Sequence, residues 1–257
     1  MGKYLDDRVV EQMIKKQHTI PLQEKEMTMM FCDIRSFTTL SERMDQRELA
    51  LLIQEFRNIA VTAVKDSGGY IDKFMGDGYM ATWGVPIILG NHQEGACKAI
   101  LEMRKNLIEY NTTRAQQDLP RISVGFGVAA GRVLIGEVEN SGKTEYSVLG
   151  NAVNVASRLQ DLTKLADCDC VVSKEVFEAL KNKAAFEDFV KTAVKGKFED
   201  VHIYKILGLF NEAGVFYSNY LIWDIKFIGT LKPGLMKNTV PNLKLYDYGK
   251  FRKKRAA

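Results

Sequence analysis

The spacing of apolar positions predicts three long helices. The clearest covers 46–65, where apolar residues recur every three to four positions and a glycine pair follows, as in an amphipathic helix with a glycine C-cap. The other two are expected at 91–117 and 151–165. Short helices are expected after Ser36 and Ser173, because serine favours the position that precedes a helix.

Short apolar runs between turn residues predict the strands. They are expected at 27–32, 70–75, 79–83, 121–130, 132–138, 144–149 and 168–172, with a further pair across 186–207. The pair Asp77-Gly78 between two of these runs is a strong hairpin signal. Because helices repeatedly return the chain to hairpins, we expect an α+β fold in which helices pack on a mostly antiparallel sheet.

The ends of the 257-residue chain differ from its middle. An amphipathic pattern at 4–16 predicts an N-terminal linker helix within 1–23, and one globular domain is expected over 24–209. The remainder, 210–257, is rich in aromatic residues, follows neither period and ends in a basic run. We therefore expect a C-terminal extension with a basic tail.

The charge of the chain belongs mainly to that tail. The net charge is +4, but five of the 36 basic residues lie in the last eight positions. Without those five, the acidic residues outnumber the basic ones by one. The body is therefore nearly neutral, and no nucleic-acid partner is expected.

Cysteine content and hydropathy exclude further classes. The four cysteines form no C-x-x-C pair, which argues against a zinc site or a disulfide framework. No stretch reaches the ~18–20 apolar residues of a membrane helix. The charged N-terminus is unlike a signal peptide, so we expect a soluble, cytoplasmic chain.

Two aspartates stand out by their context. Asp33 ends a buried apolar strand in FCDIRSFT, and Asp77 sits at the hairpin tip in KFMGDGYMA. A buried carboxylate needs a counter-charge or a metal, because leaving it unpaired is costly. Two such aspartates on adjacent strands could hold two Mg²⁺ ions for an in-line displacement at phosphorus. The alternative is a pair of ordinary turn or capping aspartates.

Groups suited to a phosphorylated ligand lie nearby in the sequence. Residues 35–38 follow Asp33 and open a helix, and free N–H groups at a helix N-terminus bind phosphate. Asn154 and Arg158 are four apart and share one helical face. Arginine suits phosphate charge and asparagine a sugar edge, although a solvated helix face would show the same spacing.

Two glycine motifs do not fit a nucleotide-binding loop. The stretch 136–144 resembles a phosphate-binding P-loop, but five residues rather than four separate its glycines and the following segment looks extended. Gly125 and Gly127 miss the spacing of a dinucleotide-binding turn. Neither motif is taken as functional.

Five separated motifs, in order, resemble the class III nucleotidyl cyclase catalytic domain: FCDIRSFTTLSE, GGYIDKFMGDGYMA, VGFGVAAGRVLIGEV, EYSVLGNAVNVASRL and VKGK. The resemblance covers about 24–207. It implies a ferredoxin-like, palm-like antiparallel sheet with helices packed on it. It also implies conversion of a nucleoside triphosphate to its 3′,5′-cyclic monophosphate and pyrophosphate, in antiparallel dimers with active sites between the subunits.

The resemblance assigns the metal and phosphate positions residue by residue. Asp33 and Asp77 match the aspartates that bind two Mg²⁺ or Mn²⁺ ions, and the carbonyl of Ile34 would add a ligand. Phe37 and Thr38 lie in the turn that holds the triphosphate.

The remaining assignments concern the base, the ribose and the transferred phosphate. Lys73 matches the residue that reads the purine, where lysine goes with adenine and glutamate with guanine, and Ser147 matches its partner. Asn154 matches the residue that orients the ribose, and Arg158 the one that stabilises transition-state charge. Lys195 matches the lysine that binds the outer phosphates.

Ser147 departs from the family pattern, which has Asp or Thr in adenylyl cyclases and typically Cys in guanylyl cyclases. Its hydroxyl can accept from the adenine amino group but lacks the methyl that fixes threonine's rotamer. We expect an adenylyl cyclase that converts ATP to cyclic AMP. The alternatives are a guanylyl or relaxed-specificity cyclase, or a silent nucleotide-binding regulatory domain.

The resemblance also implies partners. In this family the metal-binding aspartates of a site come from one subunit, and this chain carries both them and the residues that the other subunit supplies. The second set comprises Lys73, Ser147, Asn154, Arg158 and Lys195. We therefore expect a symmetric homodimer with shared sites. The helix at 4–16 resembles those that link such domains to an upstream sensor or membrane region, which would lie outside this chain.

Overall fold

The architecture comes from a computed structural model, which describes residues 21–85, 90–140, 143–166, 168–192, 201–210 and 216–217. The helix expected at 4–16 lies outside these ranges, as do Lys195 and most of the expected C-terminal extension. The division of the chain at 23/24 and 209/210 stays a prediction.

The described strands form one sheet in the order β2-β3-β1-β4-β6-β8-β7, with β5 added to β4 and β9 to β8. All pairings are antiparallel except that of β4 with β6. The strands are β1 Gln23–Ile34, β2 Tyr70–Met75, β3 Gly78–Trp83, β4 Val124–Asn140, β5 Lys143–Leu149, β6 Cys170–Ser173, β7 Ala184–Thr192, β8 Val201–Phe210 and β9 Phe216–Tyr217.

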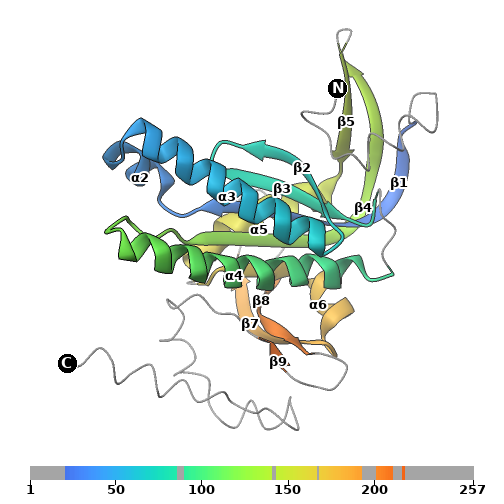
Figure 1. Ribbon diagram of the computed structural model, residues 1–257. Coiled ribbons are helices and arrows are strands. Elements are labelled where there is room, and N and C mark those ends of the chain that lie inside the picture. Colours follow the sequence, from blue (N-terminus) through green and yellow to red (C-terminus); the bar gives the residue numbers. More distant parts are fainter. Residues whose placement is uncertain are drawn as a thin grey trace, which may run out of the picture.

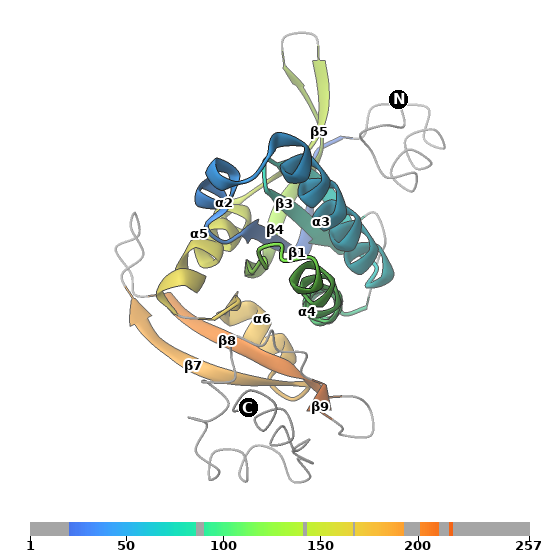
Figure 2. The ribbon, with the colours of Figure 1, turned by 60° about the vertical axis from the view of Figure 1, so that its left-hand side comes forward.

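Helices cover both faces of this sheet. They are α2 Phe37–Arg43, α3 Gln46–Asp66, α4 His92–Gln116, α5 Asn151–Leu165 and α6 Lys174–Leu180. Helices α3, α4 and α6 pack on one face and α5 on the other (Figures 1 and 2). The predicted α+β fold with a mostly antiparallel sheet is confirmed, and so are the three long helices.

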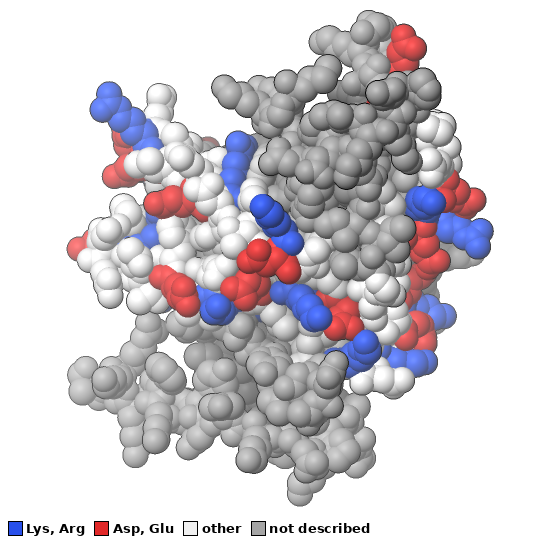
Figure 3. Space-filling view, turned by 45° about the vertical axis from the view of Figure 1, so that its right-hand side comes forward, with Lys and Arg blue, Asp and Glu red and all other residues white. Residues whose placement is uncertain are grey.

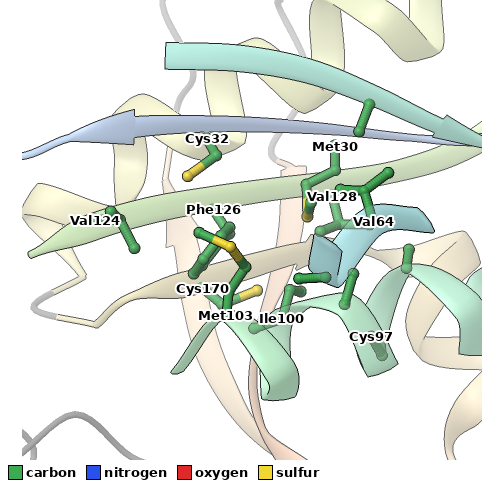
Figure 4. Packing of buried hydrophobic residues seen from close by; sticks show 14 of the residues in the cluster. Met30, Cys32, Val64, Cys97, Ile100, Met103, Val124, Phe126, Val128 and Cys170 are labelled. Carbon is green, nitrogen blue, oxygen red and sulfur yellow. The ribbon is translucent and has the colours of Figure 1, made fainter. Parts of the chain in front are cut away.

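Alternation along the strands divides the core into two layers. On β1, Met30, Cys32 and Ile34 join the layer under α3 and α4, whereas Met27 and Met29 join the layer under α5. Figure 4 shows the first layer, where side chains of β1 and β4 meet those of α4. Successive strand residues point to opposite faces, so β1 and β4 are buried on both sides and form the rigid centre of the domain.

The segment expected to hold two strands around Gly131 is one continuous strand, β4. Its ladder with β1 runs unbroken through the pairs Met27–Gly131 and Glu26–Arg132. A Cβ on Gly131 would lie 3.2 Å from the Cβ of Ala152 on α5. The glycine therefore serves the approach of a helix, not a turn, and the sequence prediction of a break is wrong.

Gly125 and Gly127 also allow α5 to approach β4, and they leave even less space for a side chain than Gly131 does. A Cβ on Gly127 would overlap the backbone of Gln160 and Ala156, and one on Gly125 would overlap the Thr163 side chain. These glycines bring α5 into backbone contact with β4, which fixes the helix that carries Asn154 and Arg158.

Surface charge is mixed on the side of the molecule that Figure 3 shows, where Lys and Arg lie between Asp and Glu. Among the residues that the structure describes, no helix combines the length and apolarity needed to cross a membrane.

Gly127→Ala should test the seating of α5. Its methyl group must displace the helix backbone, so we expect the free energy of unfolding to fall by about 1–3 kcal/mol or more. Gly90→Ala is the matched control, because a Cβ there has nothing within 4 Å. Urea unfolding compares the two, and an equally small effect of both would contradict the close packing.

Candidate active site

The site begins where β1 ends beside the start of β3. Asp33 lies next to the last residue of β1 and pairs with Gly78 on one side and Gly125 on the other. A Cβ on Gly78 would lie 3.0 Å from Asp33 Oδ1 and 2.6 Å from the Cys32 carbonyl oxygen. The missing side chain of Gly78 therefore leaves space for the Asp33 carboxylate, whereas Gly125 leaves space for Thr163 of α5.

Asp77 is brought to the same place by the predicted hairpin. It directly precedes Gly78 in the tight turn between β2 and β3. Gly76, just before it, has φ 61°, in the left-handed region that glycine adopts without strain. The two aspartates that the sequence singled out are thus adjacent in space.

The carboxyl groups of Asp33 and Asp77 share a hydrogen bond. Burial, this bond and the negative charge of Asp77 raise the pKa of Asp33 from 3.8 to about 6, against the opposing effects of Lys164 and the Ile34 backbone. Facing carboxylates resist joint ionisation. Two independent turn or capping aspartates would not show this coupling, so the structure favours the paired interpretation.

This pair fits a hard divalent cation. The described residues contain no group of three or more His, Cys, Asp or Glu side chains that could hold a metal ion. Mg²⁺, however, is commonly held by one or two carboxylates together with substrate phosphates and water, and a cation would replace the shared proton. The carbonyl of Ile34 as a further ligand stays a prediction.

The turn after Asp33 is anchored to the opposite edge of the site. The Arg35 amide donates to the Ser123 carbonyl at 2.8 Å, and its guanidinium donates to the carbonyls of Thr163 and Cys168. Arg35 therefore holds the chain in place, with its guanidinium turned toward the end of α5.

The predicted triphosphate turn has a distinctive backbone. Ser36 precedes α2 with φ 55° and makes no side-chain cap hydrogen bond, a conformation uncommon for residues other than glycine. Phe37 packs against the core, whereas Thr38 is exposed. At this turn, Phe37 offers its backbone and Thr38 can offer its side chain as well.

Arg57 is a site residue that the sequence did not reveal. From α3 it donates a 2.9 Å hydrogen bond to the Gly76 carbonyl, and its guanidinium lies 4.8 Å from the centre of the Phe74 ring. Arg57 therefore links α3 to the hairpin that carries Asp77. In the sequence Arg57 is one polar position of an amphipathic helix, with no local signal that marks it.

Asn154 and Arg158 lie together on α5, as their spacing predicted. Ala152 and Ala156 pack into the core, while Asn154 is exposed and Arg158 half-buried. At 100° per residue, Asn154 points nearly opposite to the packed alanines. The pair therefore faces away from the sheet.

Within one chain, Asn154 lies far from the carboxylates. Helix α5 runs antiparallel to β4, with Ala152 near Gly131 and Thr163 near Gly125. Because Asp33 pairs with Gly125, it lies level with the end of α5 near Thr163. Asn154 is nine residues earlier, ~14 Å away along the helix axis at ~1.5 Å per residue.

The two predicted base-reading residues occupy separate strands. Lys73 is on β2, opposite Met80 of β3, and its side chain is 53% exposed. Ser147 is on β5, opposite Gly136 of β4, and is half-buried. Figures 1 and 2 show the β4–β5 arm projecting beyond the helices.

Proton and cation should compete at Asp33 and Asp77. Because the pKa of Asp33 is raised to about 6, the affinity for Mn²⁺ should fall as pH drops through that value, by up to about tenfold per unit below it. Electron paramagnetic resonance can follow binding from pH 7.5 to 5. Asp77→Asn should abolish the pH-dependent binding, and exposed Asp66→Asn should preserve it. A Mn²⁺ affinity that stays unchanged from pH 7.5 to 5 would contradict a metal site formed by Asp33 and Asp77.

Comparison with known proteins finds similar sequences. The family model described as the adenylate and guanylate cyclase catalytic domain matches residues 21–208. An adenylate cyclase of Anabaena cylindrica is 35% identical over 191 residues, which are 71% of this chain and 37% of that protein. Adenylate cyclase 1 of Rhizobium meliloti is 30% identical over 185 residues, which are 72% and 28% of the two chains. The chain thus spans well under half of these relatives.

Solved structures agree with the fold. The adenylyl cyclase CyaB from P. aeruginosa superposes with a TM-score of 0.65 at 28% identity, covering 72% of this chain and 95% of that one. The guanylyl cyclase Cya2 has a TM-score of 0.69 at 23% identity, covering 77% and 99%, a likeness of fold alone. From these matches and the architecture, the chain belongs to the family of adenylate and guanylate cyclase catalytic domains.

Proposed function

We propose that the chain is an adenylyl cyclase, which converts ATP to 3′,5′-cyclic AMP and pyrophosphate. The observation that carries the proposal is the carboxylate pair Asp33–Asp77, which lies at the end of β1 and the start of β3 and is suited to divalent cations. The choice of ATP rests on Lys73 and on relatives named as adenylate cyclases.

In the proposed reaction the ribose 3′-oxygen attacks the α-phosphorus in line, and pyrophosphate leaves. Two Mg²⁺ or Mn²⁺ ions bound by Asp33 and Asp77 would lower the pKa of the 3′-hydroxyl and offset triphosphate charge. Arg158 would meet the charge that develops on the α-phosphate, and such electrostatic stabilisation is usually the largest catalytic contribution. Asn154 would orient the ribose.

The phosphates and the base would be held by other elements. The turn at Phe37 and Thr38 would bind the triphosphate through backbone N–H groups, and Lys195 would bind its outer phosphates. The Lys73 ammonium would donate to adenine N1, which accepts, whereas guanine N1 carries a hydrogen. The Ser147 hydroxyl would accept from the adenine amino group, and its small size keeps a relaxed-specificity or guanylyl cyclase as the second candidate.

The position of α5 supports a site shared between two copies. Asn154 and Arg158 face away from the sheet, and Asn154 lies ~14 Å along the helix axis from the level of Asp33. A second copy related by a two-fold axis could supply the missing half to each carboxylate pair. The catalytic unit would then be a homodimer with two equivalent sites.

Mixing variants should reveal such sharing. Asp33→Ala and Arg158→Ala should each be inactive, but half of the dimers in an equal, re-equilibrated mixture would be mixed, each with one intact site. We expect about a quarter of the wild-type activity. Cyclic nucleotide formation and light scattering measure activity and dimer content.

The matched control mixes Asp33→Ala with Asp77→Ala. Both changes damage the same half-site, so every dimer in that mixture lacks an intact pair of carboxylates. We expect no recovery there. Recovery in both mixtures, or in neither when mixed dimers are present, would contradict the shared site.

A further inference from the structure

We propose that Asp72 is a positioning residue that fixes the Lys73 ammonium and so sets the preference of the site for adenine. This inference rests on the proposed role of Lys73 as the base-reading residue. It is carried by a strand irregularity, an ion pair and the burial of its acidic member.

A β-bulge places the two side chains together. In the ladder between β2 and β3, Ile71 pairs with Ala81 and Lys73 pairs with the adjacent residue, Met80, so Asp72 is the extra residue that the register skips. Neighbouring residues of a regular strand point to opposite faces, but a bulge re-aims the side chains beside it. Here the Asp72 carboxylate reaches the Lys73 ammonium, with Oδ2 3.2 Å from Nζ.

The bulge also decides which face of the sheet Lys73 occupies. Met80, which Lys73 opposes, belongs to the core layer under α5. Met27 and Met29 of β1 also belong to this layer. Asp33 lies an even number of residues after them on the same strand, so its side chain points to the same face. Lys73 is therefore presented on the sheet face that carries the carboxylate pair.

The two side chains of the Asp72–Lys73 ion pair differ strongly in their exposure to solvent. The Asp72 side chain is 2% exposed and that of Lys73 is 53% exposed. A ligand could therefore reach the ammonium but not the carboxylate. Lysine has three donors, so the ion pair with Asp72 leaves donors for an acceptor on the base, and Asp72 would act through Lys73.

The charge of Asp72 also reaches the strand that carries the second base-reading residue. Burial raises the pKa of Tyr146, and the negative charges of Asp72 and Glu137 raise it further. Tyr146 directly precedes Ser147 on β5. The bulge of β2 and this part of β5 thus form one electrostatic neighbourhood.

Fixing the ammonium favours adenine over guanine. A lysine held by Asp72 can meet adenine N1, whereas a lysine free to swing could instead donate to guanine O6. Removing the Asp72 charge should therefore weaken ATP binding more than GTP binding. We expect about a tenfold loss for ATP, the lower limit for a hydrogen bond to a charged group, with little change in kcat.

The test uses the full chain and nucleotides that cannot cyclise. 3′-Deoxy-ATP and 3′-deoxy-GTP lack the attacking hydroxyl, so their Kd values report base recognition alone, and KM and kcat for ATP and GTP are measured alongside. Asp72→Asn should raise the Kd of 3′-deoxy-ATP about tenfold and leave that of 3′-deoxy-GTP nearly unchanged. Asp72→Glu, which keeps the charge, should restore part of the preference.

Glu102→Gln is the matched control. It breaks the exposed ion pair of Glu102 with Lys105 on α4, whose charged atoms lie 3.1 Å apart. We expect unaltered Kd values for both nucleotides. An unchanged preference in a folded Asp72→Asn chain would overturn the inference.

A double-mutant cycle separates positioning from a direct or merely structural role. In a Lys73→Met background, Asp72→Asn should leave the base preference unchanged, because the group through which Asp72 acts is gone. If Asp72→Asn alone unfolds the chain, Asp72→Glu replaces it, because the longer side chain keeps the charge but shifts the ammonium and should still reduce the preference for adenine. An equal shift in both backgrounds would overturn the positioning role.

Failure of the proposed function gives a different result. A wild-type chain that binds 3′-deoxy-GTP more tightly and forms cyclic GMP would refute the adenylyl cyclase, while a changed preference in Asp72→Asn would still support Asp72 as the positioning residue. A wild-type chain that binds neither nucleotide would refute both.

Discussion

Mutual repulsion between the carboxyl groups of Asp33 and Asp77 is the constraint on which the site depends. The β1–β3 register places Asp33 across from Gly78, next in sequence to Asp77. Arg57 holds the hairpin on one side, and Arg35 anchors the turn after β1 on the other. Their proximity raises the pKa of Asp33 to about 6, so a proton below that pH, or a bound cation, would relieve the repulsion. This is the physical reason for expecting metal-dependent chemistry at this point of the sheet.

The same rigid centre determines where the second half of the site can be. Gly125 and Gly127 seat α5 directly on β4, and the alanines of the helix face the sheet. Asn154 and Arg158 must then face outward, away from the carboxylates of their own chain. In the proposed function, the sheet end would bind metal and the helix would present phosphate-binding groups to the carboxylates of a second copy. The proposed dimer thus follows from how closely one helix packs against one strand.

Local patterns allowed the long helices, the β2–β3 hairpin and the proximity of Asp33 and Asp77 to be predicted, because each leaves a short-range signal in the sequence. The break expected at Gly131 was wrong, because a glycine that admits a helix is indistinguishable in sequence from one that turns the chain. Arg57 and the bulge at Asp72 could not be predicted either. Their roles depend on a contact between α3 and a hairpin, and on cross-strand register, which no short window of sequence contains.

The most direct measurement is cyclic nucleotide formation by the purified chain across a protein dilution series, with ATP and GTP in parallel and Mg²⁺ or Mn²⁺ present. Light scattering at each concentration gives the fraction of dimer. We predict cyclic AMP as the main product, with a specific activity that falls in proportion to the dimer fraction. A specific activity that stays constant into the range where the chain is monomeric would contradict a site built from two copies.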